Sequence, residues 1–169
     1  HYAALRAIPN MTFLRPGDPE ETNEAWLMAL ERTKGPSVLS LTRQNLPVYE
    51  KADSDWKKSI RRGAYVVRDG GSSPKITIVA TGSEVSLALE AADKARESNI
   101  RVVSMISRER FLEQDEAFRE KVIPSSSRVV VAEIGVSLGW ERFATSAKDI
   151  FCLERFGASD PAEEDVAEL

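Results

Sequence analysis

Residues 76–92 read ITIVATGSEVSLALEAA and join an apolar strand, a turn and an amphipathic helix in one short stretch. The run ITIVA at 76–80 is rich in β-branched residues, which is typical of a parallel strand buried on both faces. Gly82 and Ser83 then favour a turn, and apolar side chains recur on one face of a predicted helix over 84–97. This strand–turn–helix order predicts an α/β domain.

Further apolar runs extend the same pattern in both directions. They predict strands over residues 64–67, 102–106, 128–132 and 150–153. Helices are predicted between and after these strands, over 115–122, from Gly139 and from Pro161. The expected fold class is therefore α/β, a three-layer sandwich with a mostly parallel sheet.

A second and incomplete α/β unit precedes this domain. Strands predicted over 11–14 and 37–42 flank a helix that begins with Asp18 as the N-cap and Pro19 at the first helical position. A helix that connects two neighbouring strands predicts a right-handed crossover and parallel pairing. We expect a partial α/β domain over residues 1–53.

Trp26, Ala29 and Leu30 are predicted to form the buried face of the helix in the first unit.

The connection between the two units carries little hydrophobic periodicity. Residues 46–58 are polar and aperiodic, which indicates a linker that runs over the surface. The predicted domain boundary falls near residue 53.

Composition excludes several classes of protein. The chain has 169 residues, of which 42% are hydrophobic and 30% are charged, as in a globular protein. The net charge of −4 disfavours a nucleic-acid-binding protein, and no stretch approaches the ~20 apolar residues that span a membrane. There is neither a signal segment nor an initial Met, so we expect a cytoplasmic piece of a longer chain.

The scarcity of histidine and cysteine limits the possible catalytic sites. His1 is the single histidine, so a Ser-His-Asp triad or a multi-histidine metal site cannot be built within the chain without that terminal residue. Cys152 is the single cysteine, which excludes an intrachain disulfide and a cysteine zinc cluster. It lies in an apolar run and is interpreted as a small buried hydrophobic residue rather than a nucleophile.

Arg43 is the first candidate for a binding residue. It follows the strand predicted to end at Thr42, and Gln44 and Asn45 add further hydrogen-bonding side chains. The carboxyl ends of parallel strands face the ligand crevice in open α/β sheets. A guanidinium presents a planar fork of donors that matches phosphate or carboxylate oxygens. The alternative is that Arg43 pairs with a nearby carboxylate or extends into solvent.

Gly82 and Ser83 form a second and weaker candidate. Backbone amides at the start of the following helix could hold an anion, but a tight turn with Ser83 as the helix cap explains the same residues. Trp140 is interpreted as a packing or interface anchor rather than a residue that stacks on a ligand.

Beyond these features, the sequence resembles the C-terminal part of the transketolase family. The matching segments occur in the family's order and span almost the whole chain: LRAIPN at 5–10, RPGD at 15–18, LTRQNLP at 41–47, ATGSEV at 80–85 and RFGAS at 155–159. The TRQNLP and RFGAS runs together are specific to this family. The resemblance implies that residues 1–53 are the tail of a middle, pyrimidine-binding domain and residues 54–169 a C-terminal domain truncated at its end.

The resemblance also implies an activity for the complete enzyme. Transketolases are transferases of the pentose phosphate pathway, and they move a two-carbon ketol unit between ketose and aldose phosphates with thiamine diphosphate and a divalent metal, Mg or Ca. They are homodimers, so the implied partners are sugar phosphates, the remainder of the enzyme and a second protomer, with no nucleic acid and no membrane. The isolated chain is expected to be inactive.

Arg43 is the one site residue that the resemblance carries over, since it matches the arginine that binds the substrate phosphate in the family's RQNLP motif. The family's catalytic, cofactor-binding and metal-binding residues lie upstream of residue 1, so none is expected on this chain. Two alternatives stay open. The chain is the second subunit of a split transketolase, or it is a stand-alone regulatory or interaction module.

Overall fold

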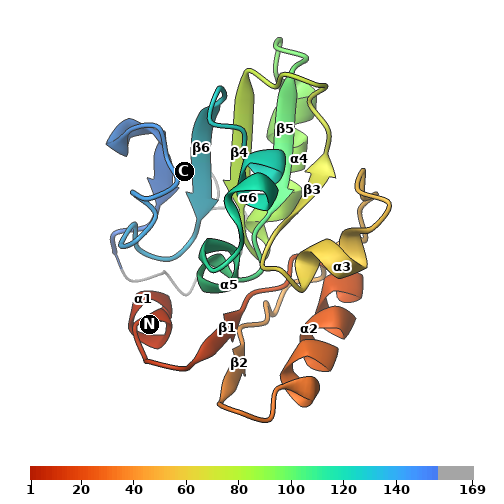
Figure 1. Ribbon diagram of the computed structural model, residues 1–169. Helices are drawn as coiled ribbons and strands as arrows, with labels where there is room; N and C mark the ends of the chain where they lie inside the picture. Colours follow the sequence, from red (N-terminus) through yellow and green to blue (C-terminus); the bar gives the residue numbers. More distant parts are fainter. Residues whose placement is uncertain (156–169) are drawn as a thin grey trace.

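The computed structural model describes residues 1–155 and contains two β-sheets. The N-terminal segment forms a two-stranded sheet, and the rest of the chain is built around a five-stranded sheet (Figure 1). Helices cover both faces of the larger sheet (Figure 1). The predicted three-layer α/β architecture, preceded by a smaller α/β unit, is confirmed.

The first unit is a strand–helix–strand crossover. Its elements are α1 (Tyr2–Arg6), β1 (Thr12–Leu14), α2 (Pro19–Glu31) and β2 (Ser37–Leu39). β1 and β2 pair in parallel, with Phe13 opposite Val38. The Asp18 side chain accepts a hydrogen bond from the Glu21 N–H at 2.7 Å, so the predicted N-cap of α2 is confirmed.

The larger sheet has the strand order β3-β5-β4-β6-β7. Its strands are β3 (Tyr65–Arg68), β4 (Ile76–Ala80), β5 (Ile100–Ser104), β6 (Arg128–Glu133) and β7 (Ile150–Cys152). All neighbours are parallel except β3 and β5, which are antiparallel. β4 lies at the centre, where Ile78 is flanked by Val102 and Val130.

Two hydrophobic clusters lie on opposite faces of this sheet. The helices of this part of the chain are α3 (Trp56–Ile60), α4 (Glu84–Lys94), α5 (Arg108–Leu112), α6 (Glu116–Val122) and the 3-10 helix η1 (Ala147–Asp149). Val102 faces a cluster shared with α4 and α2, and the next residue, Val103, faces a cluster shared with α5 and α6. Among the helices of residues 1–155, none has the length and apolar character required to cross a membrane.

The prediction of the buried face of α2 was wrong. Trp26 is 52% exposed and Leu30 is 74% exposed, whereas Glu21 and Ala25 are fully buried. The inward face is fixed by polar partners, since the Glu21 carboxyl accepts hydrogen bonds from the hydroxyl groups of Tyr49 and Tyr65. The spacing of apolar residues along the sequence carries no information about such hydrogen-bond partners.

Two other expectations differ from the structure, and a third cannot be compared with it. β2 ends at Leu39 and not at Thr42, so the polar residues that follow lie on a loop. Turns occupy the region from Gly139, where a helix was predicted, and the short η1 precedes β7. The helix predicted from Pro161 lies outside the described residues.

The linker follows the surface, as expected, but it is fastened to both units. Tyr49 donates a hydrogen bond to the Glu21 carboxyl at 2.5 Å, and Lys51 pairs with Asp18 at 2.5 Å. The Ala52 N–H donates to the Val67 carbonyl at 2.8 Å, which ties the linker to β3. These contacts hold the first unit against the larger sheet.

Candidate functional site

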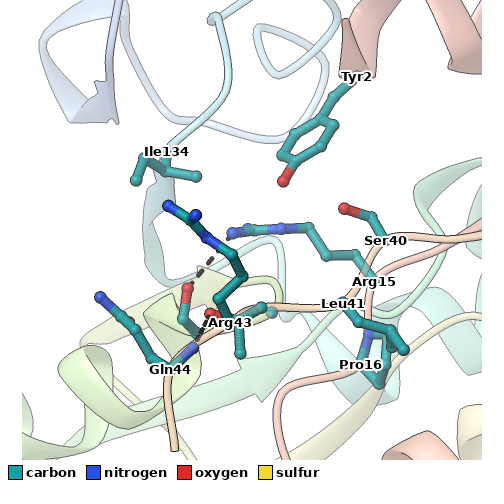
Figure 2. A pocket seen from close by; sticks show the side chains of 11 residues that line it. Tyr2, Arg15, Pro16, Ser40, Leu41, Arg43, Gln44 and Ile134 are labelled. Carbon is teal, nitrogen blue, oxygen red and sulfur yellow. Dashed lines mark hydrogen bonds between the residues drawn. The ribbon is translucent and has the colours of Figure 1, made fainter. Parts of the chain in front are cut away.

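A cavity of about 200 Å³ lies where the loop after β2 meets the turn between β4 and α4 (Figure 2). Both segments follow strands that belong to parallel pairs, so the cavity occupies the position expected of a ligand crevice. It is lined by Tyr2, Arg15, Pro16, Ser40, Leu41, Thr42, Arg43, Gln44, Gly82, Ser83 and Ile134.

Arg43 contributes a guanidinium that is open to a ligand. Its residue is exposed, and the side chain extends into the cavity toward Ile134 (Figure 2). It makes no hydrogen bond or ion pair within residues 1–155. The loop is shaped locally by the Gln44 N–H, which donates to the Thr42 hydroxyl at 3.2 Å. A fork of free donors is therefore available on one wall of the cavity.

Arg15 reaches the same cavity from the end of β1, but it is buried and neutralised (Figure 2). Its guanidinium forms a two-point ion pair with Glu84 and donates to the Thr81 carbonyl at 2.6 Å. Glu133 lies 3.7 Å away. Burial alone would lower the pKa of Arg15, but the two carboxylates raise it above its ordinary value. Arg15 is thus a fixed cation that shapes the cavity.

The turn between β4 and α4 depends on the glycine at position 82. Gly82 has φ +61°, and a Cβ placed there would lie 2.6 Å from Cζ of Arg15. Ser83 occupies the N-cap position of α4, as one of the two interpretations expected, but its hydroxyl donates to the Glu84 side chain at 2.7 Å and makes no capping hydrogen bond to the helix backbone. The absence of a side chain lets the turn pass directly over Arg15.

Tyr2 closes the cavity on the side of α1 (Figure 2). Its ring packs against Phe13 with 5.4 Å between centroids, and Cζ of Arg15 lies 5.1 Å from the same ring. These contacts fix Tyr2 between β1 and the cavity.

The chemistry of this lining is that of an anion-binding site. The guanidinium of Arg43 and the hydroxyl groups of Tyr2, Ser40 and Thr42 supply donors, whereas the terminal nitrogens of Arg15 are already used by Glu84, Thr81 and Ser83. None of the described residues in the lining is a histidine or a carboxylate, so these walls offer no general acid or base suited to neutral pH. The cavity can hold and orient an anionic group, while proton transfer would have to come from other residues.

The two candidates predicted separately from the sequence meet at this cavity. Arg43 lies on one wall, and Gly82 and Ser83 lie on another. Thr42 and Gln44 also line it, whereas Asn45 lines a neighbouring cavity of about 450 Å³. Sequence reasoning missed Arg15, although the signal was present: it follows β1 directly, and the ends of paired parallel strands lie together.

Two other candidates are not part of this cavity. Trp140 is fully buried and packs against Phe143 with 5.4 Å between ring centroids, so its interpretation as a packing residue is confirmed. Cys152 is half-buried on β7, and burial together with the nearby Glu133 raises its pKa to about 12. A thiol with this pKa is protonated at neutral pH, which agrees with the interpretation that it is not a nucleophile.

Comparison with known families matches both parts of the chain. A family model described as the transketolase-like TK C-terminal domain matches residues 63–169. A model described as the transketolase pyrimidine binding domain matches residues 1–48. Residues 49–62, which contain most of the linker and the whole of α3, fall between the two matches.

Individual relatives agree with these matches. The chain is 49% identical over 160 residues to a transketolase of Treponema pallidum, which covers 94% of this chain and 24% of that protein. A transketolase structure from Leishmania mexicana superposes with a TM-score of 0.86 at 39% identity, covering 98% of this chain and 24% of that one.

Two further structures complete the comparison. A Pichia stipitis transketolase in complex with sedoheptulose-7-phosphate has a TM-score of 0.85 at 36% identity, covering 96% of this chain and 23% of that one. A split gene transketolase, described as an inactive β4 tetramer, has a TM-score of 0.70 at 23% identity, covering 99% of this chain and 55% of that one, and shows the shared fold alone. The chain spans about a quarter of the length of the curated relatives it matches. On the strength of the two family matches and these identities, the chain belongs to the transketolase family.

Proposed function

We propose that this chain is part of an enzyme that transfers a two-carbon ketol unit from a ketose phosphate to an aldose phosphate, and that it supplies the anchor for the substrate phosphate. The observation that carries this proposal is the cavity in which the unpaired Arg43 guanidinium faces the Gly82–Ser83 turn. The structure of a relative in complex with sedoheptulose-7-phosphate, a ketose phosphate, supports the substrate class.

Arg43 acts in this proposal by positioning. A guanidinium binds two phosphate oxygens with charge-assisted hydrogen bonds, and it remains charged at every physiological pH. The phosphate lies at the end of the substrate away from the reacting carbonyl, so the interaction holds that carbonyl in line without moving a proton. Arg15, fixed by Glu84, keeps the opposite wall in place.

Thiamine diphosphate supplies the family's carbanion chemistry. The described residues do not fit its metal, because within residues 1–155 no three histidine, cysteine or carboxylate side chains come together in a way that could hold an ion. We therefore assign the metal to parts of the enzyme outside these residues. A homodimer, a cytoplasmic location and a role in the pentose phosphate pathway belong to the same proposal.

The domain boundary is also proposed here, near residue 53. The family matches leave residues 49–62 unassigned, and the linker passes from the two-stranded sheet to β3 in this interval. These observations support a division into residues 1–53 and 54–169.

Kinetics of the complete enzyme test the proposal. Arg43→Ala should raise KM for a phosphorylated ketose and lower its kcat/KM by roughly 30- to 900-fold relative to an unphosphorylated ketose, since a charge-assisted clamp contributes about 2–4 kcal/mol. Lys148→Ala, at an exposed lysine of η1, is the control and should change neither value. An equal loss for both substrates would contradict the role of Arg43. Ketol transfer by the purified 169-residue chain alone would contradict its expected inactivity.

A further inference from the structure

A second cavity, of about 350 Å³, lies at the C-terminal end of α2, whereas the linker contacts its N-terminal end, and it shares no lining residue with the Arg43 cavity. It is formed by the C-terminal end of α2 with the loop that follows, by the residue after α3, and by α5. Its lining consists of Met28, Glu31, Arg32, Thr33, Lys34, Arg61 and Arg110. Four cationic side chains therefore surround one small space.

The acidic groups near this cavity are already used. Arg61 pairs with Glu31 at 2.6 Å and with Glu24 at 3.2 Å. Glu31 is the one carboxylate in the described lining. Arg32, Lys34 and Arg110 form no ion pair within the described part of the chain. Arg61 has two carboxylate partners, so the four cations and the two carboxylates together carry a net charge of +2, in a chain whose net charge is −4.

The donors of these three side chains are only partly occupied. Arg110 donates from Nε to the Arg61 carbonyl at 3.0 Å, which leaves its two terminal amino groups for a ligand. Arg32 donates from one terminal nitrogen to Asn10, while its Nε is buried without a hydrogen-bond partner. Lys34 adds an ammonium group with three donors.

Such a cluster favours one class of ligand. Like charges around a small cavity repel each other, so the cluster costs free energy that a bound anion would recover. A phosphate monoester carries a charge of about −1.5 to −2, which matches the net charge of +2 on this cluster. We propose that this cavity binds a small molecule that carries a phosphoryl group, at a site separate from the Arg43 cavity.

Inorganic pyrophosphate is the probe for this proposal, used with the full chain carrying Arg43→Ala so that the first cavity does not contribute. Pyrophosphate should raise Tm in a saturable manner at constant ionic strength, because a ligand that binds the folded state stabilises it. The double variant Lys34→Gln and Arg110→Gln should weaken pyrophosphate binding at least tenfold, as measured by calorimetric titration. Lys148→Gln, which removes a lysine elsewhere, should bind pyrophosphate unchanged.

A second readout separates binding from a purely structural role. Without pyrophosphate, Lys34→Gln should have the same Tm as the parent or a higher one, since the exposed Lys34 side chain makes no hydrogen bond or ion pair within residues 1–155 and the repulsion is relieved. This single variant also serves if the double variant fails to fold. A rise in Tm that is equally large with chloride at matched ionic strength, or pyrophosphate affinity that is unchanged in Lys34→Gln and in the double variant, would overturn the proposal.

Discussion

Glu21 carries a carboxyl group that is fully buried at the start of α2. Burial raises its pKa above the ordinary value of 4.5, and hydrogen bonds from Tyr49, Gly17 and Tyr65 offset this shift only in part. The Gly17 N–H donates to it at 2.7 Å and the Tyr65 hydroxyl at 2.7 Å. The folded state therefore holds the Glu21 proton to a higher pH than the unfolded chain does.

This shift predicts a pH dependence of stability. The contribution of protonated Glu21 is complete below the ordinary pKa of 4.5 and is lost as the pH rises through the folded-state pKa. The Glu21→Gln side chain carries no charge at any pH. Its amide group takes the place of the carboxyl that accepts the Gly17 N–H in the parent. The stability advantage of the parent over Glu21→Gln should thus shrink as the pH rises above 4.5, as measured by urea unfolding. An advantage that grows with pH would show that the Glu21 pKa is lowered.

Single residues also show where sequence reasoning succeeds. The placement of Arg43 at a cavity could be predicted from its position shortly after a parallel strand, although β2 ends at Leu39 and not at Thr42. Glu21 could not be understood in this way. Its partners, Tyr49 and Tyr65, lie 28 and 44 positions away, so a carboxyl at a helix start looks like an ordinary surface residue.

Among the elements, the turn from β4 into α4 is the most constrained. Gly82→Ala should destabilise the protein by about 3 kcal/mol, because the alanine would have a positive φ and its Cβ would press on the buried Arg15. Thermal or urea unfolding measures this loss.

Gly71→Ala is the matched control for this turn. Gly71 also has a positive φ, at +83°, but a Cβ there would meet nothing within 4 Å. Its cost should be about 1 kcal/mol, that of the backbone conformation alone. Equal losses for Gly71→Ala and Gly82→Ala would mean that the contact with Arg15 does not constrain the turn.

Helices and strands were predicted well where the hydrophobic pattern is consistent with only one element and one buried face. β4 agrees with the prediction at both ends, because a buried parallel strand is a short apolar run between turn signals. α2 has apolar residues on two faces, with Ala25 and Met28 on one and Trp26, Leu27 and Leu30 on the other. Periodicity cannot rank two such faces, so the buried one became clear only from the packing.

For the molecule as a whole, a buried network of ion pairs, called the charge lattice below, joins the two units. Arg6 and Arg15 come from the first unit, and Glu84 and Glu133 come from the second. Arg6 pairs with Glu133 at 2.6 Å, and the Trp140 indole N–H also donates to that carboxylate. The strands around this lattice were predictable, but the pairing of residues more than 100 positions apart was not.

This lattice predicts that the two units unfold together. Glu133→Gln should lower the free energy of unfolding by about 3 kcal/mol, because it leaves the buried Arg6 without its counter-charge. Asp93→Asn, which breaks the exposed pair with Arg68, should have a much smaller effect. Urea unfolding followed by tryptophan fluorescence should show one transition in the parent protein. Two unfolding transitions in the parent, or an equal decrease in the free energy of unfolding in the two variants, would contradict the role of the lattice.

The position of a bound substrate phosphate tests the proposed site most directly. A crystal structure of the protein with a ketose phosphate should place the phosphate in the cavity between residues 40–44 and the Gly82–Ser83 turn, with its oxygens about 3 Å from the Arg43 guanidinium. A phosphate bound elsewhere on the protein, with Arg43 left in solvent, would contradict the assignment of Arg43 as the phosphate anchor.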